Sequence, residues 1–218
     1  MIIINFKTYK ETAGNKGVIV AKQIEKVAKE HNTKVIVCPQ LLDLRLLKDQ
    51  TQVELFSQKV DDVSLGKFTG SIPAETVKEI GATGTLINHS EHQIPLDKIG
   101  NIVAKAKANN LITVVCADTV ETGEKIIPFK PDYIAIEPPE LIGSDVSVST
   151  GKPELIKDSV ARLKKDGIKL LIGAGVRTSE DVRIALDYGA DGVILASEVA
   201  KSKDVEKTTL DLILPFEQ

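Results

Sequence analysis

At 218 residues the chain is long enough to bury one sizeable core and has the usual length of a single α/β barrel, so we expect one domain over residues 1–218. Its 28 basic and 31 acidic residues give a formal net charge of −3 without a long block of one sign, which argues against nucleic acid or an anionic membrane as partner. The composition therefore favours a small-molecule ligand.

The first residues carry no signal for secretion or membrane insertion. Met1 runs directly into the apolar segment IIINF, without a basic leader or an apolar stretch long enough to span a bilayer. Cys38 and Cys116 lie in separate apolar runs and form no CxxC pair, so we expect two buried free thiols rather than a disulfide or a metal site. Free thiols are typical of a reducing compartment, and we expect a cytoplasmic protein.

Short runs rich in Val, Ile and Leu recur along the chain. Most are continuously apolar rather than alternating, as expected of parallel strands that are covered on both faces. We predict eight strands, at IIINFK (2–7), KVIVC (34–38), VELFS (53–57), GTLIN (84–88), ITVVC (112–116), YIAIE (133–137), KLLIGA (169–174) and GVILAS (192–197).

Segments with a helical period lie between these runs. Residues 99–106 repeat apolar side chains at i, i+3, i+4 and i+7, and residues 182–189 follow the same pattern. Thr178 and Asp181 have the spacing of a capping box at the start of the second of these helices. Prolines stand where the first turns of helices should begin, at Pro39, Pro73, Pro95 and Pro153.

Strand and helix thus alternate eight times at a spacing of roughly 25 residues, the pattern of a (β/α)8 barrel, the TIM-barrel fold. A doubly wound open sheet is the alternative, because the number of strands does not by itself show closure. In a barrel, the loops at the carboxyl ends of the strands build the functional site. Polar residues at those strand ends are therefore the candidates for function.

Polar side chains follow the first and fourth predicted strands. Asn5 and Lys7 share one face of the first strand, and a lysine at the inner rim supplies a fixed positive charge for an anionic substrate. His89 follows the fourth strand with Ser90 and Glu91, where the positive end of a helix dipole opposes protonation of the imidazole. Taken singly, each residue also fits a solvated strand end or an ordinary turn.

Glu137 ends the sixth predicted strand and shares its parity with Tyr133 and Ala135, so its carboxylate can face the barrel mouth. Two prolines follow, and a loop that contains Gly143 then runs for about a dozen residues. Long loops in compact domains are usually functional or disordered. We interpret this loop as a candidate lid, with a solvated surface loop as the alternative.

The seventh and eighth predicted strands end in GAGV (173–176) and LAS (195–197). Glycine lets backbone N–H groups come close to a phosphate, and barrels commonly bind phosphate in the loops after these two strands. The pattern predicts a phosphate-binding barrel and leaves its reaction open.

Together and in this order, the segments NFK, NHSE, EPPELIG, GAGV and LAS resemble triosephosphate isomerase, in particular its compact archaeal type. The resemblance covers essentially the whole chain. It implies interconversion of dihydroxyacetone phosphate and glyceraldehyde 3-phosphate, a step of glycolysis and gluconeogenesis, without a metal or organic cofactor. It also implies a homo-oligomer, a dimer or a tetramer, with residues 57–71 at the subunit contact.

The same resemblance assigns roles to individual residues. Glu137 would be the base that moves a proton between two carbons, and a neutral His89 would polarise the carbonyl group. Lys7 would stabilise the enediolate and Asn5 would bind a substrate oxygen, while Ser90 and Glu91 would support these groups from behind. Phosphate would be bound by backbone N–H groups at Ile142, Gly143, Gly175, Ala196 and Ser197.

Two departures from the archaeal pattern are visible. Glu198 stands where a glycine usually follows LAS, which puts a negative charge near the expected phosphate, and His92 follows HSE, where we expect an exposed turn residue. The short chain also predicts trimmed outer helices, in particular after strands four to six.

Two alternatives to the isomerase stay open at this point. One is another phosphate-binding barrel enzyme, such as a sugar phosphate epimerase, although a metal-dependent epimerase needs more histidine and carboxylate ligands than this chain offers at its strand ends. The other is a non-catalytic barrel that only binds a phosphorylated ligand.

Overall fold

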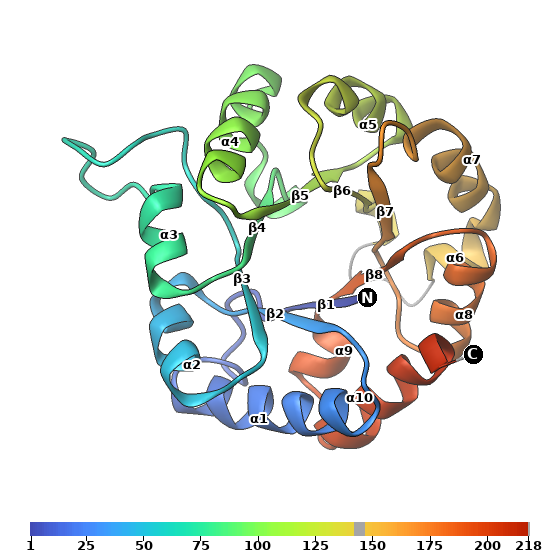
Figure 1. The fold of residues 1–218 in the computed structure, drawn as a ribbon. Helices are drawn as coiled ribbons and strands as arrows, with labels where there is room; N and C mark the ends of the chain where they lie inside the picture. The colour runs from blue at the N-terminus through green and yellow to red at the C-terminus, as the bar shows by residue number, and fades with distance from the viewer. Residues whose placement is uncertain (142–146, 218) are drawn as a thin grey trace.

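Eight parallel strands close into a barrel in the computed structural model, which describes residues 1–141 and 147–217 (Figure 1). Each strand pairs with its neighbours in sequence, and the last strand pairs with the first through Ile2–Val193, Ile3–Ile194 and Ile4–Leu195. Closure confirms the predicted (β/α)8 barrel and rules out the open sheet. The strands are β1 (Ile2–Asn5), β2 (Val35–Cys38), β3 (Glu54–Ser57), β4 (Gly84–Ile87), β5 (Ile112–Ala117), β6 (Tyr133–Ile136), β7 (Lys169–Ile172) and β8 (Gly192–Leu195).

An outer ring of helices surrounds the strands (Figure 1). After strands four to six, where the sequence predicts trimmed helices, α4 has 13 residues, α5 has 7, α6 has 4 and α7 has 11. The helix α4 is therefore not trimmed to a turn, and its whole apolar stripe is buried. Short helices also follow β2 and β3. The α-helices are α1 (Asn15–Glu30), α2 (Leu44–Gln50), α3 (Ala74–Ile80), α4 (Leu96–Ala108), α5 (Val120–Ile126), α6 (Val148–Gly151), α7 (Pro153–Leu163), α8 (Ser179–Asp187), α9 (Ser197–Ala200) and α10 (Val205–Ile213). Short 3-10 turns are η1 (Leu41–Asp43), η2 (Ser90–His92), η3 (Ile127–Phe129), η4 (Pro139–Leu141) and η5 (Leu214–Glu217).

Alternation along each strand divides the apolar residues into two cores. Side chains of one parity, such as Ile3 and Ala135, fill the barrel interior, while Ile4 and Ile136 pack between the sheet and the helices. Asn5, the last residue of β1, has the interior parity, which brings its side chain into the barrel mouth. Cys38 and Cys116 are both buried free thiols, as predicted.

Residues 58–73, between β3 and α3, extend beyond the ring of helices (Figure 1). Asp61 closes the base of this projecting loop, because its N–H donates to the carbonyl of Ile72 and its carboxylate accepts from the N–H of Ile72, both at 2.8 Å. Asp62 ties the loop to α4 through ion pairs of 2.9 Å with Lys98 and Lys105. The loop thus has a fixed base.

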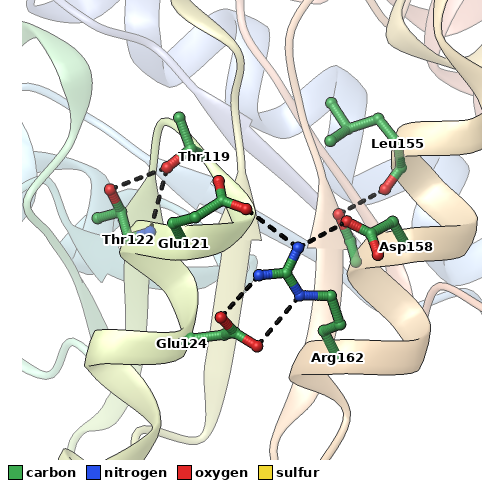
Figure 2. Close-up of polar contacts among 8 residues, drawn as sticks. Thr119, Glu121, Thr122, Glu124, Leu155, Asp158 and Arg162 are labelled. Atoms are coloured by element: carbon green, nitrogen blue, oxygen red, sulfur yellow. Dashed lines mark hydrogen bonds and ion pairs between the residues drawn. The ribbon is translucent and has the colours of Figure 1, made fainter.

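Arg162 on α7 connects two neighbouring helices of the outer ring (Figure 2). Its Nε and Nη2 atoms donate to the two carboxylate oxygens of Glu124 at 3.1 and 2.7 Å, and Nη1 donates to Glu121 and Asp158 at 3.0 Å. Glu121 and Glu124 belong to α5, so the guanidinium fastens α7 to α5. A bidentate contact of this kind is stronger than a single surface ion pair.

None of the described helices is long and apolar enough to cross a membrane.

Replacing Arg162 by Met should lower thermal stability by a few degrees near neutral pH and by less in acid. The hydrogen bond from Arg162 lowers the pKa of Glu124, so its contribution is present above the ordinary glutamate pKa and is lost as the pH falls through the lowered one. The melting temperatures of variant and wild type should therefore converge between about pH 5 and pH 3.

Arg183→Met is the matched control, since Arg183 pairs only within α8, with Glu180 and Asp187 among the described residues. Replacing Arg183 should lower the melting temperature by less than replacing Arg162. Equal losses for the two variants would contradict the role of Arg162 as a connection between helices.

Candidate functional site

A cavity of about 260 Å³ opens at the carboxyl ends of the strands. Its walls come from the segments that follow β1, β4, β6, β7 and β8, which are the segments that the sequence singled out. Most of the predicted site residues line this one cavity, namely Asn5, Lys7, His89, Glu91, Glu137, Gly175, Ala196 and Ser197. Ile142 and Gly143, also predicted, lie outside the described residues.

Lys7 is held at several points after β1. Its backbone has a positive φ of 45°, a conformation that side chains other than glycine seldom adopt. The Lys7 N–H donates to Oδ1 of the buried Asn5 at 2.9 Å, and Nζ donates to Oε1 of Glu91 at 2.7 Å. Because only 13% of the Lys7 side chain is exposed, the ammonium group is a fixed charge at the cavity wall.

Asn88 and His89 shape the turn after β4. Asn88 has a positive φ of 60°, its Nδ2 donates to the carbonyl of Cys116 at 3.0 Å, and its Oδ1 accepts from the N–H of Ile94 at 2.9 Å. This turn directs the buried His89 into the cavity. His89 Nδ1 accepts the N–H of Glu91 at 3.1 Å, so the ring proton belongs on Nε2.

Glu137 directly follows β6 and is buried. Its Oε2 atom has no hydrogen-bond partner among the described residues and lies 3.8 Å from Nε2 of His89. Burial raises the pKa of the nearby Cys116 thiol and the Glu137 carboxylate raises it further, so the thiol stays protonated beside the carboxylate. The unpaired Oε2 is available to a ligand, because a buried acceptor of this kind is costly unless a partner uses it.

Gly173, just after β7, provides space for Glu137. A Cβ atom at this position would lie 2.5 Å from Cγ of Glu137 and 2.8 Å from Cγ2 of Ile194. The glycines of GAGV were expected to lie against phosphate, but Gly173 lies against the side chains of Glu137 and Ile194.

The seventh and eighth loops also line the cavity. Gly175 has a positive φ of 71°, and Ala196 and Ser197 lie at the start of α9. Asp181 in the predicted capping box accepts the N–H groups of Arg177 and Thr178 at 3.1 and 3.0 Å, which fixes the path of the seventh loop. These two hydrogen bonds hold the end of the seventh loop against the start of α8.

Two charged residues accompany these loops. Glu198 lines the cavity, so the negative charge noted in the sequence lies at the site. Arg177 lines it as well and was missed by the sequence analysis, although it directly follows GAGV. Ser90, predicted behind His89, lines a small second cavity on the other side of Glu137, together with Asp118. His92 is exposed, as predicted.

Gln58 is another residue that the sequence analysis did not single out. It is the first residue after β3, and its side chain contacts Asn5 and Lys7. It could have been found by treating polar residues at the end of the third strand as candidates for function, as was done for the other strands.

Among the described residues, no group of three or more His, Cys, Asp or Glu side chains could hold a metal ion.

Comparisons with known proteins agree on one family. A family model described as triosephosphate isomerase matches residues 1–211. The chain is 43% identical over 215 residues to the triosephosphate isomerase of Methanocaldococcus jannaschii, covering 98% of each chain, and 43% identical over 214 residues to that of Saccharolobus solfataricus, covering 98% of this chain and 94% of the relative. The crystal structure of triosephosphate isomerase from Bartonella henselae has a TM-score of 0.75 at 19% identity, covering 100% of this chain and 98% of that one, a likeness of fold.

Nitrogen NMR should find the neutral imidazole of His89 as the tautomer with its proton on Nε2, because Nδ1 accepts the N–H of Glu91. His31 is the internal control, since its Nδ1 lies 2.6 Å from Oε1 of Glu217 and must carry a proton to make that contact. A proton on Nδ1 of His89 would contradict the orientation described above.

Proposed function

Since the chain belongs to the triosephosphate isomerase family, we propose that Glu137 and His89 carry out its interconversion of dihydroxyacetone phosphate and glyceraldehyde 3-phosphate. The observation that carries this proposal is the free, buried Oε2 of Glu137 opposite Nε2 of His89 at 3.8 Å. Family membership does not favour the epimerase or the non-catalytic barrel.

Glu137 acts as the base. Its unpaired oxygen takes the proton from the carbon beside the carbonyl group and returns it to the neighbouring carbon. The Cys116 thiol lies beside the carboxylate, and the lack of a Cβ atom at Gly173 leaves room for the Glu137 side chain. A buried base that is packed in this way needs little rearrangement before the proton moves.

His89 and Lys7 stabilise the charge that develops on oxygen. The Nε2–H group of His89 donates to the substrate oxygens, and the Nδ1 contact with Glu91 keeps this proton in place. Lys7 places an ammonium group at the same wall, and Asn5 adds a buried amide. Donors that are arranged beforehand in a site shielded from water lower the energy of the enediolate.

Phosphate is bound at the other end of the cavity, by backbone N–H groups of Gly175, Ala196 and Ser197. The fixed seventh loop supports this assignment, and Ile142 and Gly143 complete it by the family resemblance. Glu198 opposes the phosphate charge, while Arg177 in the same wall offsets it.

The chain acts as one domain and as part of a homo-oligomer. Pairing of β1 with β8 joins residues near the two ends of the sequence in one barrel, which supports a single domain over residues 1–218. The projecting loop exposes 68% of Leu65 and 50% of Phe68, and burying these apolar side chains against another copy of the chain favours association. The two buried free thiols fit the cytoplasm.

Glu137→Asp should lower kcat by about 100-fold or more, because a side chain shorter by one methylene withdraws the base from the carbon proton. Inhibition by inorganic phosphate should stay unchanged, since the phosphate end is untouched. The measurement is steady-state isomerisation of dihydroxyacetone phosphate together with the inhibition constant of phosphate.

The same replacement at Glu154, an exposed residue of α7, is the control and should leave the rate unchanged. Full turnover by Glu137→Asp would show that another group is the base.

A further inference from the structure

Gln58 joins three segments of the barrel through a single nitrogen atom. Its Nε2 donates to the carbonyl oxygen of Lys7 at 2.9 Å, and to Oδ1 of Asn5 and the carbonyl oxygen of Cys38 at 3.2 Å. Three acceptors around one end of the side chain also identify that end as the NH₂ group. The residue follows β3, so these bonds link it to β1 and β2.

The backbone of Lys7 needs such support. A positive φ in a residue other than glycine is strained and persists only where the surroundings hold it. Asn5 holds the Lys7 N–H, Glu91 holds Nζ, and Gln58 holds the carbonyl group. Gln58 also contacts the Oδ1 atom that receives the Lys7 N–H, so it acts on both ends of the strained residue.

The projecting loop does not require these bonds. Asp61 closes the base of the loop against Ile72, and Asp62 fastens it to α4, as described above. The side chain of Gln58 instead points toward the barrel mouth. Gln58 is nevertheless not among the described residues that line the cavity, so it reaches the substrate only through its neighbours.

We propose that Gln58 is a positioning residue, which holds Lys7 in its left-handed conformation and so fixes the ammonium group and the Asn5 amide for catalysis. This inference rests on the proposed function, because it takes Lys7 and Asn5 as residues that contact the substrate. Without the Gln58 donor, the Lys7 carbonyl loses a partner and the backbone relaxes toward a negative φ.

Gln58→Met tests the proposal with a side chain of similar length that donates no hydrogen bond. We expect kcat/KM for dihydroxyacetone phosphate to fall by about 10- to 100-fold at a temperature well below the melting transition. Gln52→Met, at an exposed position before β3, is the matched control and should keep the wild-type value. A kcat/KM for Gln58→Met within about twofold of wild type would overturn the proposal.

Gln58→Glu adds a readout that a merely structural role would not move. Its carboxylate would face three acceptor oxygens, which raises its pKa, whereas the protonated form donates one hydrogen bond again. The kcat/KM of this variant, relative to wild type, should therefore rise as the pH falls from about 8 to about 5. A pH profile parallel to that of wild type would count against the proposal.

Wild-type turnover, measured in parallel, separates this inference from the proposed function. If the wild type does not isomerise the substrate, the proposed function fails, and the crystal structure of Gln58→Met still decides the positioning role. A negative φ at Lys7 in that structure supports the proposal. An unchanged Lys7 with its Nζ still on Glu91 contradicts it.

Discussion

The pairing of β8 with β1 is the constraint on which the rest of the structure depends. It closes the barrel and brings segments about 190 residues apart in sequence to one rim. Lys7, which follows β1, and Ser197, which follows β8, line the same cavity only because of this contact. In an open sheet these two segments would lie at opposite edges. The Lys7 ammonium group and the proposed phosphate loop at Ser197 could then not contact the same ligand.

Closure of the barrel determines the position of each side chain around the cavity, and local hydrogen bonds determine its orientation. Glu91 illustrates the difference, because its N–H fixes the His89 ring while its carboxylate holds the Lys7 ammonium group. Gln58 in turn donates a hydrogen bond to the backbone carbonyl of Lys7. The buried Oε2 of Glu137, by contrast, has no hydrogen-bond partner among the described residues.

The fold could be read from the sequence because its signals are local. Continuous apolar runs gave the strands, and the pair Thr178 and Asp181 gave the start of α8. The positions of Asn5 and Glu137 followed from strand parity alone. The resemblance to a family, carried by five short motifs, supplied the reaction, which parity and spacing had left open.

The missed residues depend on contacts between distant segments. Nothing in the sequence says that Gln58 reaches the carbonyl of Lys7, since that contact crosses from β3 to β1 and requires a positive φ. The role of Gly173 likewise depends on how Glu137 lies against it. The length of α4 was misjudged because total chain length does not tell which helices are short.

We propose that Glu137 moves a carbon-bound proton with help from groups of the chain alone. The most direct test is to incubate the wild-type protein with dihydroxyacetone phosphate in heavy water with a chelator present. We predict rapid formation of glyceraldehyde 3-phosphate that carries solvent deuterium at the carbon beside the carbonyl group, because a carboxylate base exchanges its proton with solvent. Absence of conversion, or conversion that the chelator abolishes, would contradict the account.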